Sequence, residues 1–154
     1  MRRTPLGAVA AATALALALT PAAAEAKGKG RTIVIEARSK LEHVQAVDNS
    51  PSGTSAGDVL VFTEQLFTPR GKRIGSDAAS CVRLFDATSL CTGLYVLPGG
   101  QLMVQLLQPG PTGTYDQAIT GGTGRYAGAR GIVRVAQSSG GDRFTFRIRV
   151  ARRA

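Results

Sequence analysis

The feature that most constrains the fold is a glycine-rich stretch in the last third of the chain, Ala118–Gly131. It holds five glycines in fourteen positions and lies between two strand-like segments, Tyr115–Thr120 and Gly131–Gln137. Glycine adopts positive φ angles without a steric penalty, so this cluster indicates a sharp chain reversal with close backbone contacts. The glycines lack the G-x-G-x-x-G spacing of a phosphate loop, and a strand rather than a helix is predicted to follow. We interpret the stretch as a structural corner.

Turn-forming residues divide the rest of the chain into short alternating segments. Strands are predicted over residues 32–37, 58–67, 79–85, 90–97, 101–107, 115–120, 131–137 and 143–150. No segment after the N-terminal region predicts a helix. Regularly spaced strands with tight turns favour an antiparallel barrel or sandwich, and periodicity does not separate the two.

The predicted strand over residues 58–67 is largely apolar on both faces. One face carries Asp58, Leu60, Phe62, Glu64 and Leu66, and the other carries Val59, Val61, Thr63, Gln65 and Phe67. Successive side chains of a strand point to opposite faces, so both sides of this sheet are expected to be covered. Such a strand suits a barrel wall that packs inside and associates outside, and we expect a homo-oligomer.

The first 26 residues have the pattern of a secretory signal peptide. Arg2 and Arg3 precede the apolar run Leu6–Thr20, and Ala24-Glu25-Ala26 has the form of a cleavage site. The apolar run is short for a membrane span. We expect a secreted domain over residues 27–154, with no stable membrane insertion.

The chain is strongly basic, with a formal net charge of +9. A basic domain invites a nucleic-acid hypothesis. The basic residues are spread along the chain, however, and the aromatic residues form no base-stacking motif. We therefore expect no nucleic-acid partner. A weak affinity for the anionic polymers of a cell wall fits the charge.

Two cysteines, Cys81 and Cys91, suit an exported protein. Their spacing fits a hairpin that turns near Asp86-Ala87 and sets them opposite each other. A disulfide there would contribute roughly 2.5–3 kcal/mol in the chain-entropy model. A reactive thiol is the alternative, and neither cysteine has a histidine close in sequence. Two cysteines and one histidine do not suggest a metal site.

The glycine-rich stretch resembles the corresponding segment of dirigent proteins and of the allene oxide cyclase-like barrels. The similarity continues upstream in Gly57–Phe67, Lys72–Gly75, Cys81–Leu84 and Leu97–Leu102. It covers roughly residues 57–146. The resemblance implies one eight-stranded antiparallel β-barrel of the calycin type, in an all-β domain that forms oligomers.

The resemblance also implies candidate catalytic residues. Plant allene oxide cyclases use a glutamate on the first strand, a polar residue on the second, a cysteine on the third and a tyrosine after the central hairpin. The matching positions here are Glu36, by a loose alignment, then Glu64 and Cys81, while Gln108 falls where the tyrosine is expected. Dirigent proteins use acidic residues in their cavity, and Asp58 and Glu64 are the candidates for that role.

Ligand contacts are expected from Leu60, Phe62, Gln105 and Arg125. Arg125 lies beside the glycine corner, where it either attracts an anionic ligand at a cavity mouth or is a surface residue of a turn. Glu64 either points inward, where burial would raise its pKa and favour acid–base use, or pairs with an arginine such as Arg83.

The sequence therefore predicts a secreted barrel that binds an apolar small molecule and steers its cyclisation or coupling without cofactor or metal. A hydrolase is disfavoured, since a triad would need His43, the only histidine. The alternatives are a non-catalytic carrier of the lipocalin type and a structural barrel filled by side chains. An open cavity with an unpaired buried acid would favour catalysis, an open cavity without one would favour carriage, and a filled interior would favour the structural role.

Overall fold

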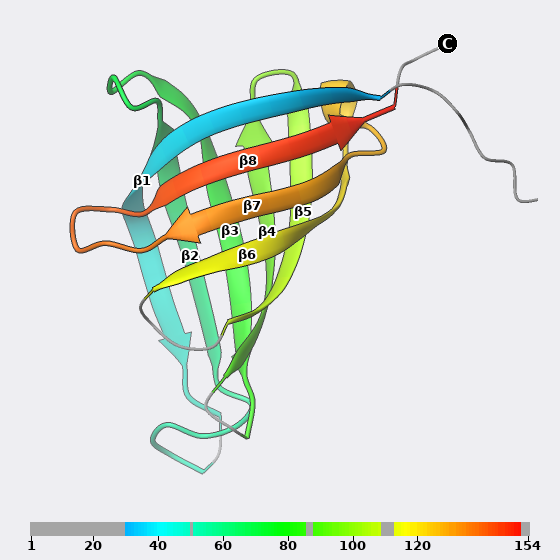
Figure 1. Ribbon diagram of the computed structural model, residues 1–154. Coiled ribbons are helices and arrows are strands. Elements are labelled where there is room, and N and C mark those ends of the chain that lie inside the picture. Colours follow the sequence, from blue (N-terminus) through cyan, green and yellow to red (C-terminus); the bar gives the residue numbers. More distant parts are fainter. Residues whose placement is uncertain (1–29, 50, 86–87, 109–112, 152–154) are drawn as a thin grey trace, which may run out of the picture.

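The computed structural model describes residues 30–49, 51–85, 88–108 and 113–151. The expected signal peptide and the turn at Asp86-Ala87 lie outside the described residues. Within them, the chain forms one closed barrel in which each strand pairs antiparallel with the next and β8 closes on β1 (Figure 1). The strands are β1 (Arg31–Val47), β2 (Val59–Phe67), β3 (Arg73–Arg83), β4 (Ser89–Leu97), β5 (Gly100–Gln108), β6 (Thr114–Gly122), β7 (Arg130–Ala136) and β8 (Arg143–Val150).

All eight predicted strands are present, and the barrel is confirmed over the sandwich. Two strands, β1 and β3, begin or end well outside the residues that alternation predicted. β1 runs for 17 residues, and its pairing with β2 shifts register between Leu41 and His43. Every residue of β1 after Ser39 is exposed, so the alternation that predicts residues 32–37 does not continue, and the bulge interrupts it further. In Figure 1, β1 starts beside β8 and then bends down along β2, so it joins the two sides of the barrel.

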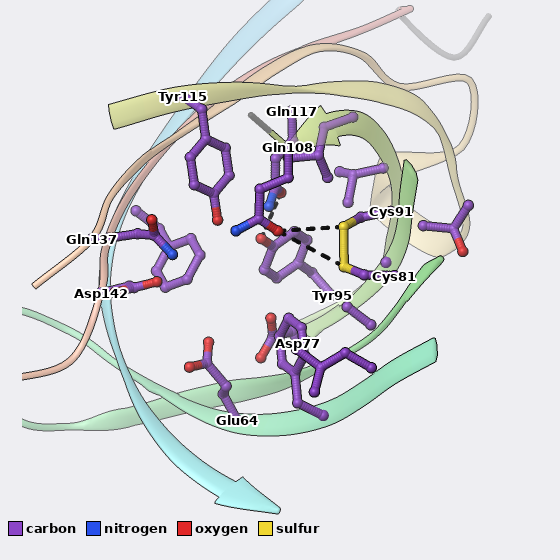
Figure 2. Close-up of a pocket in the computed structure, with 18 of the residues that line it drawn as sticks. Glu64, Asp77, Cys81, Cys91, Tyr95, Gln108, Tyr115, Gln117, Gln137 and Asp142 are labelled. Atoms are coloured by element: carbon purple, nitrogen blue, oxygen red, sulfur yellow. Dashed lines mark hydrogen bonds between the residues drawn. A yellow bond between two sulfur atoms is a disulfide. The ribbon is translucent and has the colours of Figure 1, made fainter. Parts of the chain in front are cut away.

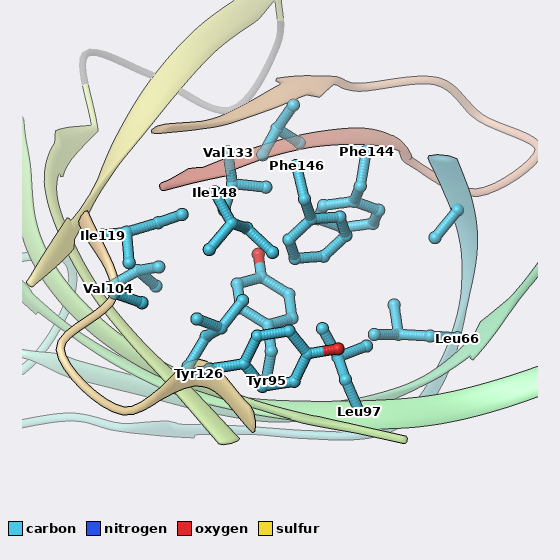
Figure 3. Packing of buried hydrophobic residues seen from close by; sticks show 14 of the residues in the cluster. Leu66, Tyr95, Leu97, Val104, Ile119, Tyr126, Val133, Phe144, Phe146 and Ile148 are labelled. Carbon is cyan, nitrogen blue, oxygen red and sulfur yellow. The ribbon is translucent and has the colours of Figure 1, made fainter. Parts of the chain in front are cut away.

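One end of the barrel interior is filled by apolar side chains (Figure 3). Phe146, Leu66 and Leu102 are fully buried there. The Tyr95 ring packs edge-on against Phe146, with ring centroids 4.9 Å apart. Closure of the sheet brings these residues together from strands distant in sequence, and burial of such side chains contributes on the order of 1.5–3 kcal/mol each.

The glycine-rich stretch closes this filled end, as a structural corner. It contains a single short 3₁₀ turn, η1 (Gly124–Tyr126), whose Tyr126 side chain is buried in the core. Gly124 has a φ of +57°, and a Cβ there would collide with the backbone carbonyl of Gly99. Close backbone approach and positive φ together explain the need for glycine.

The predicted disulfide is present. Cys81 and Cys91 are directly paired across β3 and β4 and are bonded through their sulfur atoms. Both residues are buried and face the interior. The described part of the chain holds no helix with the length and hydrophobicity needed to cross a bilayer.

Candidate functional site: an acidic cavity in the barrel

The other end of the barrel interior is hollow, with a cavity of about 310 Å³. Tyr95, Val104 and Phe144 belong both to the apolar core and to the cavity lining, so they form its floor. One wall is apolar, built from Leu41, Val44, Leu60, Phe62 and Leu106. The remaining lining is mostly polar and is shown in Figure 2, where the labelled side chains surround one open space.

Glu64 and Asp77 form a carboxyl pair inside the cavity. They are register partners on β2 and β3, and both side chains point inward. Asp77 is only 7% exposed, and its Oδ1 atom has no hydrogen-bond partner. Burial, together with the nearby Glu64 charge, raises the pKa of Asp77 to about 8. Two adjacent buried carboxylates cannot both ionise cheaply, so Asp77 holds a proton at neutral pH.

Glu64 has a different environment from its neighbour. Burial raises its pKa, but a hydrogen bond donated by the Ser39 hydroxyl to Oε1, 3.1 Å long, favours the ionised form. Ser39 is itself fixed, because the backbone N–H of Asp142 donates to its Oγ at 3.1 Å and its own N–H donates to the Asp142 carbonyl at 2.8 Å. Glu64 is therefore the member of the pair that carries the negative charge.

Two tyrosines also belong to the polar part of the cavity lining. The Tyr95 hydroxyl donates a 2.7 Å hydrogen bond to Oε1 of Gln117. Burial raises the pKa of Tyr95 well above its usual range and that of Tyr115 to about 12. Both phenols are therefore neutral and cannot act as bases. Tyr115 can donate a hydrogen bond to a ligand, whereas the single hydroxyl proton of Tyr95 is donated to Gln117.

The third carboxyl of the lining, Asp142, also has a raised pKa because it is partly buried. The cavity lining contains no lysine, arginine or histidine among the residues that the structure describes. Within that same part of the chain the one ion pair joins Arg134 to Asp116 on the outer surface. Glu64 does not pair with Arg83, so the inward-pointing alternative holds.

Several residues expected from the sequence meet at this cavity. Leu60, Phe62 and Glu64 line it from β2, and the Cys81–Cys91 disulfide lines it from β3 and β4. The side-chain oxygen of Gln108 contacts the disulfide and lies 3.4 Å from the Cys91 sulfur. Gln108 stands where the resemblance implied a tyrosine, and Tyr115 on the adjacent β6 supplies a phenol to the same space.

Other expected site residues lie elsewhere. Asp58 precedes β2 and is half-buried in the connection from β1, where it accepts hydrogen bonds from the backbone N–H groups of Asn49 and Ser55. These hydrogen bonds, of which the one from Ser55 has the largest effect, lower the pKa of Asp58. Asp58 therefore stabilises a loop and does not line the cavity. By alternation Asp58 would point to the same inner face as Glu64, but it lies just before the first residue of β2.

Glu36, Gln105 and Arg125 are also placed outside the cavity. Glu36 and Gln105 are exposed, since their strands point Ala37 and Val104 inward instead. Arg125 belongs to η1 at the filled end, and its guanidinium lies over the Tyr126 ring, 5.4 Å from the centroid. The turn-residue alternative for Arg125 therefore applies, and it is not at the cavity mouth.

Sequence reasoning missed seven polar lining residues: Asp77, Thr92, Tyr95, Tyr115, Gln117, Gln137 and Asp142. Asp77 fell just before the strand predicted over 79–85, but β3 begins at Arg73. Counting back by twos from Cys81 along an extended strand would have placed Asp77 on the inner face. Asp142 sits in the β7–β8 connection, and no periodic signal marks its direction.

Residues 38–150 match the family described as allene oxide cyclase barrel like domain. The chain belongs to this family. No curated protein matches the sequence.

Solved structures share the fold. A pyocyanin demethylase is similar with a TM-score of 0.69 and 24% identity, over 75% of this chain and 99% of that one. A pterocarpan synthase dirigent protein gives 0.64 and 12%, over 81% and 93%. A Diels–Alderase from Streptomyces koyangensis gives 0.61 and 15%, over 80% and 70%. The barrel is thus one that cyclases and dirigent proteins also use.

Proposed function

We propose that the protein is a cofactor-independent isomerase or cyclase that acts on an apolar small molecule in the barrel cavity. The observation that carries the proposal is the buried Glu64–Asp77 pair, in which one carboxyl is protonated and its neighbour is ionised. An acid and a base side by side in a water-poor pocket are the elements of general acid–base catalysis. The unpaired Oδ1 of Asp77 favours this function over carriage.

The proposed reaction begins when Asp77 gives its proton to an oxygen of the substrate, such as a carbonyl, an epoxide or a quinone methide. Positive charge then develops on the adjacent carbon, and the ionised Glu64 stabilises it. A hydroxyl or enol of the same molecule attacks that carbon and closes the ring, while Glu64 takes the proton that the nucleophile loses. The proton returns from Glu64 to Asp77, so the substrate gains and loses no atoms.

The apolar wall has the role of holding the substrate in a folded conformation. Phe62 and Leu60 line the cavity on the same inward face of β2 as Glu64, beside the carboxyl pair, and offer no competing hydrogen bonds. Fixing the two ends of one molecule close together removes much of the entropic barrier to ring closure. We further propose that the protein acts outside the cell, where a disulfide between Cys81 and Cys91 persists.

The test uses organic extracts of the cells that make the protein, incubated with the pure protein in heavy water. We expect one compound of the extract to disappear and a product to form. The product should have the same mass as that compound but a different chromatographic retention time, or should carry deuterium from the solvent. Asp77→Asn and Glu64→Gln are expected to lower this conversion by about 10²–10⁴-fold. Asp116→Asn, which changes an exposed carboxyl outside the barrel, is the matched control and should retain full activity.

A compound that is retained by the protein but never converted would refute the enzymatic function and establish carriage. Absence of both retention and conversion would leave the structural role.

A further inference from the structure

The cavity is acidic in a chain that is basic overall. Its lining holds the carboxyls of Glu64, Asp77 and Asp142, and no described lining residue is basic. The whole chain, in contrast, has 19 lysines and arginines against 10 acidic residues. Burying carboxyl groups without a positive partner costs free energy. No described side chain of the lining supplies a positive charge to offset these carboxyl groups.

Two buried oxygen atoms of the described cavity lining have no hydrogen-bond partner. Oδ1 of Asp77 and Oε1 of Gln137 are buried and have no hydrogen-bond partner, and both residues line the cavity. Figure 2 shows Glu64, Asp77, Asp142 and Gln137 around the same open space. Buried polar atoms are normally paired. Oε1 of Gln137 and the ionised Glu64 accept hydrogen bonds, so they match a ligand that donates them.

We propose that the cavity selects a ligand with an apolar body and a positively charged nitrogen, of the protonated amine or iminium class. The nitrogen lies between Glu64 and Asp77, and the apolar body lies against Leu60 and Phe62. The inference rests on the proposed function in that it uses the same cavity, and it adds the chemical class of the substrate. A carboxylate or phosphate ligand is disfavoured, since it would meet the negative charge of Glu64 and no basic side chain among the described lining residues.

The charge of the pocket depends on several facing groups. Asp77 is faced by Glu64 from β2, by Tyr95 from β4, by Tyr115 from β6 and by Asp142 from the β7–β8 connection. The two tyrosines stay neutral, so only carboxyls alter the charge near neutral pH. As the pH rises and Asp77 loses its proton, the attraction for a cation increases.

The experiment compares three probes that share one naphthalene ring: 1-naphthylmethylamine, 1-naphthalenemethanol and 1-naphthoic acid. Their affinities for the purified protein are measured by titration calorimetry at neutral pH. The cationic amine is expected to bind at least about tenfold more tightly than the neutral alcohol, and the acid is expected not to bind. Equal affinities, or binding of the acid, would overturn the inference.

Variants locate the charge effect. Glu64→Gln should lower the affinity for the amine by about tenfold at neutral pH while leaving the alcohol unchanged. Asp77→Asn replaces a protonated carboxyl, so it should lower the affinity for the amine only at alkaline pH, where Asp77 is ionised in the parent protein. Asp116→Asn should change neither affinity, because Asp116 is exposed and paired with Arg134 outside the barrel. If the two cavity variants lost affinity for the amine and the alcohol alike, charge would not be what selects the ligand, and the inference would be overturned.

The two proposals fail separately. Conversion of a compound without preference for the amine would remove the cation selectivity and keep the enzymatic function. Preference for the amine without any conversion would keep the selectivity and remove the enzymatic function.

Discussion

Asp77 is the residue whose surroundings differ most from those of an ordinary carboxyl group. It sits on an inner position of β3, opposite Glu64 and Tyr95 in the pairing of the strands, and one oxygen lacks a partner. Backbone hydrogen bonds from Asp77 and Glu64 only partly offset its burial, and an amide or apolar group would be buried there at lower cost. Such a residue is typical of a site that trades stability for chemistry.

The free energy of unfolding should therefore fall as the pH rises towards the pKa of Asp77. Its pKa is about 8 in the folded chain against 3.8 for an ordinary aspartate, so the folded state holds a proton that the unfolded state has lost between those values. Stability is then greatest at low pH within this window and falls by up to about 1.4 kcal/mol per pH unit towards alkaline pH. Asp77→Asn should remove this component and be more stable than the parent at neutral pH.

Urea unfolding of both proteins at several pH values across this window checks the prediction. Glu64 and Asp142 also have raised pKa values, so the parent and the variant share part of the slope. The difference between the two profiles isolates Asp77. Parallel profiles would show that Asp77 does not titrate in this range.

At the scale of elements, the corner between β6 and β7 depends on glycines of two kinds. Gly131 has a φ of +141°, and a Cβ there would collide with the backbone carbonyl of Arg147 on β8. Gly121 has an ordinary backbone conformation, and a Cβ would meet nothing within 4 Å. The same glycine-rich stretch thus holds a position that the fold requires and one that it does not.

Gly131→Ala should destabilise the barrel by at least about 2 kcal/mol, because β8 cannot move away without breaking its pairing with β1. Gly121→Ala is the matched control and should change the free energy of unfolding by less than about 0.5 kcal/mol. Thermal or urea unfolding of the two variants measures the contrast. Equal stability of the variants would mean that the corner relaxes freely.

The strands could be predicted from the sequence because alternation and turn residues are local signals. The site could be predicted only in part. Alternation within residues 58–67 grouped Glu64 with Leu60 and Phe62, and all three share the cavity. The same alternation could not show where the paired strand starts, so Asp58 was grouped with them although it belongs to a loop. Asp142 reaches the cavity only through closure of the barrel, which no local pattern encodes.

At the scale of the whole molecule, the outer surface of the barrel is divided into two unlike halves. Outward positions in the middle of β2–β5 are uncharged and form a shallow groove with the second half of β1, lined by His43, Gln45, Val61, Thr63, Ala78, Ser80, Thr92, Leu94 and Met103. The outward positions of β7 and β8 are rich in arginine: Arg130, Arg134, Arg143, Arg147 and Arg149. Figure 1 shows these two groups of strands on different sides of the barrel.

The uncharged half is the face where we expect a second copy of the chain. Met103 is 56% exposed there, and Val82, Leu90 and Leu107 on the same strands are exposed as well. Contiguous exposed apolar surface is typical of interfaces. Light scattering should find an oligomer that Met103→Lys dissociates. Val34→Lys is the matched control, since Val34 is 60% exposed on the other half and should leave the assembly intact. A monomeric parent protein would refute the expectation.

Repulsion among its arginines should lower the stability of the arginine-rich half of the barrel. Arg130 and Arg149 are directly opposed across β7 and β8, and Arg38 and Arg143 are directly opposed across β1 and β8. Like charges opposite each other in a sheet destabilise it by a few tenths of a kcal/mol, and salt screens exposed charges. Arg149→Gln should therefore raise the melting temperature at low salt, and the gain should shrink as salt is added.

Arg134→Gln is the informative control for this repulsion. Arg134 contributes two hydrogen bonds to Asp116, at 2.8 and 2.9 Å, so its removal deletes an attraction together with a positive charge. It should give no rise in melting temperature, although the net charge falls by the same amount as in Arg149→Gln. If both variants were stabilised equally, total charge rather than the opposed pair would set the effect. If neither responded to salt, the arginines of this face would be too well solvated to influence folding.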